Sequence, residues 1–224
     1  MPRQPTSSVE IVLASESPRR HELLAALGLT FAVRPADVNE APLPGERPAA
    51  LAQRLSRAKA LVASEHAPDA LVIAADTLVV LEDAVLDKPA TPEIALRILR
   101  RLRGRTHDVL TGLTLRQGAG DELTQLACTP VTMRDYRDDE MRAYVASGDP
   151  MDKAGAYAIQ SEEFAPVARL QDCYANVVGL PLCHLYRALI ERGVPMRHPL
   201  DVCPWPVQQG HCEWAAAILN GEIA

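Results

Sequence analysis

The most constraining feature of this sequence is a transition from a strand to a helix near its beginning. Residues 9–13 are rich in β-branched residues and predict a short strand. Ser17 is a suitable N-cap, and Pro18 suits the first position of the helix that follows. Leucines at helical spacing continue this helix until Gly28, where it is expected to end.

Two arginines, Arg19 and Arg20, occupy the first turn of this helix. Cations are disfavoured there in a purely structural helix, because the N-terminus is the positive end of the helix dipole. Free backbone N–H groups, serine hydroxyls and two guanidinium groups would together hold an anion, which makes a phosphate site one interpretation. A solvated basic turn fits the same spacing equally well.

A local basic motif in an acidic protein favours a small anionic ligand over a nucleic acid. The 224-residue chain has a formal net charge of −6, whereas binding along a phosphate backbone usually needs a basic face. No apolar run approaches the roughly 20 residues of a membrane span, and the N-terminus lacks the apolar core of a signal peptide. With five cysteines in no paired framework, the sequence predicts a cytoplasmic protein without membrane or nucleic-acid partners.

The remaining pattern mixes strands and helices and predicts an α/β fold with a mixed sheet. A proline-rich loop covers residues 35–48, residues 152–160 are expected to end in a strand-like pair, and residues 176–181 form a turn. Asp76 and Thr77 separate two of the strands. The strands are expected at 30–34, 70–75, 78–81, 84–86, 106–116, 123–133 and 164–172. The helices are expected at 49–65, 92–102, 138–147, from Pro181 onward and at 213–219.

Several motifs of nucleotide-binding and hydrolytic proteins are missing from the sequence. It contains no G-x-x-x-x-G-K-[ST], no G-x-G-x-x-G after the first strand, no H-E-x-x-H and no G-x-S-x-G. What remains is a set of charged residues near the ends of elements. Asp76 follows a buried strand, where a carboxylate can bind a metal or act as a general base, although a turn cap is the alternative.

The other candidate residues have an ordinary structural interpretation when each is taken alone. Glu40 would be a surface carboxylate, Lys59 a solvated helix lysine and Lys88 a turn lysine. Gln160 could read a base edge or satisfy sheet backbone. His107 is expected to be a packed strand residue.

The C-terminal tail contains histidines and cysteines, but they lack the paired spacing of a zinc site. Ordinary packing of a tryptophan-containing tail is favoured for His198, Cys203, His211 and Cys212. The cysteines elsewhere lie in apolar stretches and are expected to be small hydrophobic residues: Cys128, Cys173 and Cys183.

Five sequence blocks together resemble the Maf family of nucleoside triphosphate pyrophosphatases, in the family's order between Ile11 and Gly193. They are Leu-Ala-Ser-Glu-Ser-Pro-Arg-Arg (13–20), Ala-Asp-Thr (75–77) with Asp-Lys-Pro (87–89), His-Asp-Val-Leu-Thr-Gly (107–112), Gly-Ala-Tyr-Ala-Ile-Gln (155–160) and Asn-Val-Val-Gly-Leu-Pro (176–181). The resemblance implies an elongated mixed β-sheet with flanking helices and two lobes around a cleft, similar to inosine triphosphatases. Residues 1–195 would form this domain, and residues 196–224 a C-terminal extension.

The resemblance also implies a reaction and a set of site residues. The enzyme would hydrolyse a nucleoside triphosphate to the monophosphate and pyrophosphate with a divalent cation, Mg²⁺, Mn²⁺ or Co²⁺. Asp76 and Glu40 would bind this cation. Asp76 resembles the catalytic carboxylate. The substrate contacts carried over by motif are Ser15, Arg19, Arg20, Glu40, Lys59, Thr77, Lys88 and Gln160. A homodimer is a further expectation from the family.

The resemblance narrows the substrate as well. The family branch that acts on 7-methyl-GTP carries Trp at the position of Arg19 and differs at Thr77 and Gln160, so this chain is more similar to the branch acting on dTTP and UTP. A glutamine amide can pair with both an acceptor and a donor on a pyrimidine edge, in agreement with that choice. Alternatives are a hydrolase of non-canonical purine triphosphates and a catalytically silent nucleotide-binding regulator of cell division.

The chain departs from the family pattern directly after Gln160. Ser161 replaces the usual glycine, and Glu162 and Glu163 follow it. These residues are expected to stiffen a loop near the base pocket and to repel phosphate, which weakens the prediction of a base more than the prediction of the reaction.

Overall fold

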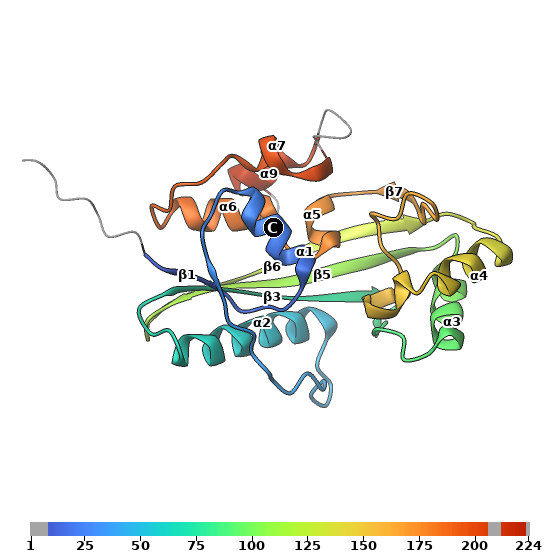
Figure 1. Cartoon of the computed structure of the whole chain (residues 1–224), viewed down its shortest axis with the longest axis horizontal. Helices are drawn as coiled ribbons and strands as arrows, with labels where there is room; N and C mark the ends of the chain where they lie inside the picture. Colours follow the sequence, from blue (N-terminus) through green and yellow to red (C-terminus); the bar gives the residue numbers. More distant parts are fainter. Residues whose placement is uncertain (1–8, 206–211, 223–224) are drawn as a thin grey trace, which may run out of the picture.

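A mixed seven-stranded sheet runs along the long axis of the protein in this computed structural model, which describes residues 9–205 and 212–222 (Figure 1). The spatial order is β2-β1-β3-β5-β6-β7, and β4 pairs with β3. The strands are β1 (Ile11–Leu13), β2 (Ala32–Val33), β3 (Leu71–Leu81), β4 (Ala84–Val85), β5 (Thr106–Gln117), β6 (Asp121–Met133) and β7 (Val167–Leu170). β1 pairs in parallel with β2 and β3, and the other ladders are antiparallel. The predicted mixed sheet is confirmed.

The central strand β3 is continuous, and the predicted break at Asp76 and Thr77 is wrong. β5 pairs with it without interruption from Leu71 to Val80, so ladder hydrogen bonds keep the chain extended through both residues. Every residue of β3 is buried except Thr77, which is half-buried. Apolar residues occupy both faces of this strand, as is typical of a sheet covered on both sides.

Helices cover both faces of the sheet (Figure 1). α2 (Pro48–Glu65) packs on one face, against the even-numbered residues of β3. The opposite face carries two separate groups of helices. One group is α1 (Pro18–Ala26), α5 (Tyr174–Val178), α6 (Leu182–Ile190), α7 (Pro199–Val202) and α9 (Ala215–Asn220). The other is α3 (Pro92–Leu102), α4 (Asp138–Ala146), η1 (Asp149–Asp152) and η2 (Ala154–Ala156).

These two groups form separate hydrophobic clusters on the same face of β3. Leu71, Ile73 and Ala75 belong to the first cluster, and Val79 and Leu81 belong to the second. Thr77 lies between them in the alternation of the strand. The two clusters are the cores of two lobes, which leaves a cleft above the middle of β3.

Glycine 112 sets the distance between α2 and the sheet. It lies opposite Asp76 in the β3–β5 ladder. A Cβ atom added there would lie 2.2 Å from the carbonyl oxygen of Ala52 in α2. The helix therefore touches the sheet at backbone distance, which only glycine allows.

The segment before Gln160 differs from the predicted strand-like pair. Gly155 adopts a φ of +72°, and Ala156 also has a positive φ. A Cβ atom on Gly155 would lie 2.8 Å from Val79. The chain therefore forms tight 3₁₀ turns against β3 instead of an extended strand. The predicted turn at 176–181 is also partly wrong, because Asn176 to Val178 belong to α5.

The described part of the C-terminal extension packs on the first lobe. Cys203, Ala215 and Ile218 are buried in its cluster, and Arg187 donates to the carbonyl oxygen of Ile218 at 2.8 Å. Among the described residues, no group of three or more His, Cys, Asp or Glu side chains could hold a metal ion. His211, one of the residues weighed for zinc, lies outside them. The boundary at residue 195 stays a prediction.

Over residues 9–205 and 212–222, no helix combines the length and the apolar character needed to cross a lipid bilayer.

The close approach of α2 predicts the effect of a single methyl group. We expect Gly112→Ala to lower the free energy of unfolding by about 3 kcal/mol, the upper end for overpacking, because the obstructing atoms are backbone. Urea denaturation followed by circular dichroism measures this. Gly120→Ala is the control, since no heavy atom lies within 4 Å of its added Cβ, and it should change stability by less than about 0.5 kcal/mol. Equal effects of the two substitutions would contradict this account of α2.

Candidate active site

The candidate site lies at an open edge of β3. On this side, β1 pairs only with residues 71–73 and β4 only with residues 80–81. Within the described residues, no strand pairs with the stretch between them, so Asp76 and Thr77 lie at an accessible sheet edge. The expectation that Asp76 ends a strand is wrong. Asp76 nevertheless lies at an open part of the sheet edge, because β1 is too short to pair with this part of β3.

Arg20 connects three separate parts of the chain at this edge. Its Nε donates to the carbonyl oxygen of Gly179 at 2.8 Å, and its two terminal nitrogens donate to Ser15 Oγ at 3.2 Å and Thr77 Oγ1 at 3.0 Å. Burial lowers the pKa of Arg20, while the nearby Asp76 carboxylate opposes that shift. A guanidinium has five N–H donors, so two remain for a ligand.

Further hydrogen bonds hold the acceptors of Arg20 in place. Ser15 Oγ also accepts from the Ser17 backbone N–H at 3.2 Å. Thr77 Oγ1 lies 2.9 Å from Thr111 Oγ1 on β5. Asn176 donates to the carbonyl oxygen of Val109 and to Thr129 Oγ1, both at 3.0 Å, and so fixes the helix that precedes Gly179.

Lys59 lies between two carboxylates on the α2 side of the strand. Its Nζ is 2.6 Å from Asp76 Oδ1 and 2.6 Å from Glu40 Oε1. The Lys59 hydrogen bond is the main reason that the pKa of Glu40 is lowered. Lys59 follows Ala52 by seven residues and so lies on the same helical face, the face that touches the sheet at Gly112.

Asp76 is buried, and its second oxygen is unpaired. Only 6% of the residue is exposed, and Oδ2 has no hydrogen-bond partner within the described residues. An unpaired buried carboxylate oxygen is costly unless a water, a proton or a cation meets it. The Asp76 and Glu40 carboxylates would not fill the coordination sphere of a divalent cation, so oxygens of a bound molecule or of water would have to complete it.

Two adjoining hollows flank this edge. The Lys59 cavity, of about 740 Å³, is lined by Ser15, Glu40 and Lys59 among others. The Thr77 cavity, of about 140 Å³, is lined by Thr77 and Gln160 among others. Both are lined by Ser17, Arg19, Arg20, Lys88 and Asp152. The cations therefore lie where the two hollows meet.

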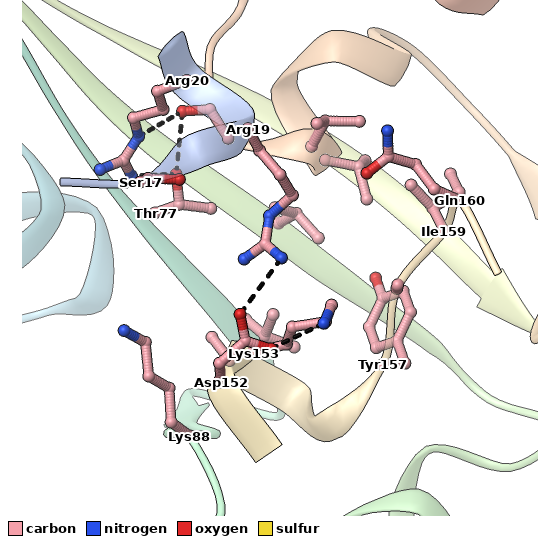
Figure 2. Close-up of a pocket in the computed structure, with 17 residues that line it drawn as sticks. Ser17, Arg19, Arg20, Thr77, Lys88, Asp152, Lys153, Tyr157, Ile159 and Gln160 are labelled. Carbon is pink, nitrogen blue, oxygen red and sulfur yellow. Dashed lines mark hydrogen bonds and ion pairs between the residues drawn. The ribbon is translucent and has the colours of Figure 1, made fainter. Parts of the chain in front are cut away.

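Figure 2 shows the Thr77 cavity, with Lys88 and Gln160 at opposite ends. The guanidinium of Arg19 reaches toward Asp152, with 3.6 Å between the charged atoms. Lys153 is held by Asp152 at 2.6 Å and by Asp149 at 3.1 Å. Arg19 and Lys153 thus have acidic partners, whereas Lys88 and Gln160 are exposed.

All predicted site residues come together in this region. Eight of them line one of the two hollows: Ser15, Arg19, Arg20, Glu40, Lys59, Thr77, Lys88 and Gln160. Asp76 reaches the site through its contact with Lys59. The sequence analysis missed Asp152, Lys153 and Tyr157. The signal for Asp152 and Lys153 was their position before the Gly-Ala-Tyr-Ala-Ile-Gln block, from which one residue separates them, and the block itself contains Tyr157. The roles of these residues stay predictions.

Ser161 and Glu162 line a hollow together with Gln160, and Glu163 follows them. None of them lines the Thr77 or Lys59 cavity, and Glu162 and Glu163 are exposed beyond Gln160. The expectation that they stiffen the loop and repel phosphate stays a prediction.

A cation-lined cleft on the open edge of a mixed sheet defines an α/β protein that binds small anions. The sequence comparison is more specific: the profile described as Maf-like protein matches residues 10–192. This chain belongs to the Maf family.

Several relatives of this chain are named as pyrophosphatases. A dTTP/UTP pyrophosphatase of Moorella thermoacetica is 47% identical over 186 residues, covering 83% of this chain and 96% of the relative. The dTTP/UTP pyrophosphatase of Geobacter sp. (strain M21) is 46% identical over 183 residues, covering 80% and 93%. A HAM1 protein from Coxiella burnetii covers 82% of this chain and 99% of its own at a TM-score of 0.47 and 19% identity, a likeness too weak to support any statement about activity.

The three contacts of Arg20 predict that a lysine cannot replace it. Arg20→Lys keeps the charge but loses the planar fork that reaches three acceptors at once. We expect affinity for inorganic tripolyphosphate to fall roughly 10- to 100-fold, measured by isothermal titration calorimetry. Arg101→Lys, on the exposed side of α3, is the matched control and should change nothing. Unchanged affinity in Arg20→Lys would refute the assignment.

A buried histidine braces the wall of the Thr77 cavity. His107 on β5 lies 2.8 Å from the Tyr157 hydroxyl through Nε2, and Tyr157 lines the cavity. Only 3% of His107 is exposed, and burial lowers its pKa to about 4. The folded protein therefore keeps this imidazole neutral.

The low pKa of His107 predicts an acid-sensitive stability. Below pH 6.5 the unfolded chain gains a proton on this residue that the folded protein does not, so the free energy of unfolding falls as pH drops from 6.5 to 4, by up to roughly 3 kcal/mol. Urea denaturation over this range should show a shallower slope for His107→Gln than for the wild type. His66→Gln, at an exposed position, should keep the wild-type slope. Parallel curves for wild type and His107→Gln would exclude this explanation.

Proposed function

We propose that this protein hydrolyses nucleoside triphosphates to monophosphate and pyrophosphate, with dTTP, UTP or modified pyrimidine triphosphates as substrates. The observation that carries the proposal is the Asp76–Lys59–Glu40 cluster beside a cleft with further cations. The names of the relatives support the same reaction.

The cations account for binding of the triphosphate. Arg19, Arg20 and Lys88 lie at the junction of the two cavities, and Lys59 lines one of them. A triphosphate along this junction would meet all four, with the remaining N–H donors of Arg20 directed to it. Negative charge that develops on the departing pyrophosphate would be stabilised by the same groups.

The cluster accounts for activation of water. Asp76 Oδ1 is engaged by Lys59, which leaves the unpaired Oδ2 to accept a proton from a water. The water oxygen forms a bond to the α-phosphorus, and the bond from that phosphorus to the bridging oxygen breaks. The proton goes to Asp76, and the electron pair leaves with pyrophosphate.

Asp76 and Glu40, together with phosphate oxygens, are the groups that would hold a divalent cation such as Mg²⁺, Mn²⁺ or Co²⁺. The unpaired Asp76 oxygen fits this use, because each carboxylate oxygen has lone pairs for more than one partner. The chemistry that such a cation supplies is neutralisation of charge on the non-bridging phosphate oxygens. Lys59 keeps the two carboxylates close together before a cation binds.

The other end of the Thr77 cavity accounts for the choice of base. Gln160 lies there, distant from Lys88 (Figure 2), and its amide offers one donor and one acceptor side to a pyrimidine edge. Arg19 in the cavity matches the dTTP and UTP branch rather than the 7-methyl-GTP branch. The cytoplasmic location and the homodimer stay predictions.

The role proposed for Asp76 predicts that replacing it nearly abolishes the release of pyrophosphate. With Mg²⁺, Mn²⁺ or Co²⁺, the wild type should release pyrophosphate and monophosphate in equal amounts from dTTP and UTP. Asp76→Asn should lower kcat by roughly 10²- to 10⁴-fold, since it removes the base and a carboxylate charge. Ion-exchange chromatography of the products measures both.

Asp69→Asn, in an exposed turn, is the control and should keep full activity. Release of orthophosphate in place of pyrophosphate would refute the reaction, and full activity of Asp76→Asn would refute its mechanism. Nucleotide binding without turnover under all three cations would instead favour a catalytically silent regulator of cell division. A preference for ITP or 7-methyl-GTP would favour a hydrolase of purine triphosphates.

A further inference from the structure

The C-terminal extension reaches the end of the cleft where Gln160 lies. A third hollow, the Trp205 hollow, of about 450 Å³, is lined by Gln160, Arg169, Tyr174, Pro204 and Trp205 among others. Ile159 and Gln160 line both this hollow and the Thr77 cavity. Pro204 and Trp205 lie beyond residue 192, where the match to the family ends.

Trp205 is anchored on the family domain. Its ring stacks on that of Tyr174, with 5.4 Å between the ring centroids and 30° between the planes. Tyr174 is buried at the start of α5, the helix that leads to Gly179 and so to Arg20. Cys203, two residues before Trp205, is buried in the cluster of the first lobe. The indole is thus a fixed part of this wall.

Gln160, in contrast, is part of a backbone turn at the surface. Its side chain is exposed and makes no hydrogen bond to the residues that the structure describes. The turn itself is closed by the Ser161 N–H donating to the carbonyl oxygen of Ala158 at 3.1 Å. An amide that reads a base edge must keep one orientation, and a rigid aromatic wall beside it restricts the orientations it can adopt.

We propose that Trp205 is a specificity-determining residue: the C-terminal extension closes the outer side of the nucleobase end and holds Gln160 in position to read a pyrimidine. The proposal rests on the proposed function, because it assumes that the base lies at Gln160. Trp205 acts as a positioning residue through Tyr174 and the wall shared with Gln160. It has no part in binding the triphosphate.

The first test measures equilibrium binding, which needs no turnover. Isothermal titration calorimetry with the non-hydrolysable α,β-imido analogues of dTTP and dATP gives the ratio of the two affinities. We expect Trp205→Ala to reduce the pyrimidine preference roughly fivefold to tenfold, mainly through weaker dTTP binding. Trp205→Phe retains a stacking ring and should restore the ratio to within about twofold of the wild type.

Trp214 offers a matched control. It is the other tryptophan of the chain and packs on the same cluster, but it does not line the Trp205 hollow. Trp214→Ala should lower thermal stability and leave the affinity ratio unchanged. If Trp205→Ala weakens both analogues equally, or if Trp214→Ala changes the ratio as much, the role of Trp205 is structural and the proposal is overturned.

A second test does not depend on an alanine variant that folds. In Trp214→Phe, Trp205 is the sole tryptophan, and its fluorescence should change when the dTTP analogue is added but not with inorganic tripolyphosphate. An equal response to both ligands, or to neither, would overturn the proposal. Failure of the proposed function is seen separately, as a wild-type protein that releases no pyrophosphate, while the affinity ratio and the fluorescence still decide the role of Trp205.

Discussion

The site depends on a carboxylate buried in the middle of the central strand. Asp76 is nearly inaccessible, and a buried charge of this kind is destabilising unless an opposite charge lies beside it. Lys59 supplies that charge, but only because α2 approaches the sheet at backbone distance over Gly112, the β5 residue that lies opposite Asp76 in the ladder. A larger residue there would move the helix, separate the ion pair and leave the carboxylate uncompensated. The packing of the fold and the chemistry of the site are therefore one constraint, which involves a helix, a glycine and a strand far apart in the sequence.

Adjacent residues of one strand divide the work between the two faces of the sheet. Side chains alternate along a strand, so Asp76 points toward α2 and Thr77 toward the cleft between the two lobes. A substrate can reach both only where β3 has a free edge, in the stretch between its pairings with β1 and β4. Under the proposed function, the three-residue length of β1 matters, because a longer first strand would pair with β3 past Asp76 and close the candidate site. The cations of α1 stand where that longer strand would have continued.

Local patterns predicted most of the elements, and they failed where a long-range contact decides the structure. Pro92 and the capping oxygen of Thr91, 3.3 Å from the Ile94 nitrogen, mark α3 without outside help. The break predicted at Asp76 is absent because β5 supplies a partner across the whole of β3, which no local window contains. The strand-like pair expected at the end of residues 152–160 is also absent: Gly155 is pressed on Val79, and Ile159 and Gln160 lie in a turn. Site residues were predictable from short blocks that together resemble the family, whereas Asp152 lies outside those blocks and its contact with Arg19 is set by the fold.

The two arginines of α1 have the same chemistry and opposite settings. Arg20 donates to three protein acceptors, so its side chain has little conformational freedom left to lose when a ligand binds. It is therefore preorganised. Arg19 has one longer ion pair, to a largely exposed carboxylate on the other lobe, and such a contact contributes little and exchanges readily. A triphosphate that entered the cleft would compete with Asp152 for Arg19 but not with Gly179 for Arg20. Under the proposed function, Arg20 would define where the phosphates lie, and Arg19 would be the side chain that moves from Asp152 to the substrate.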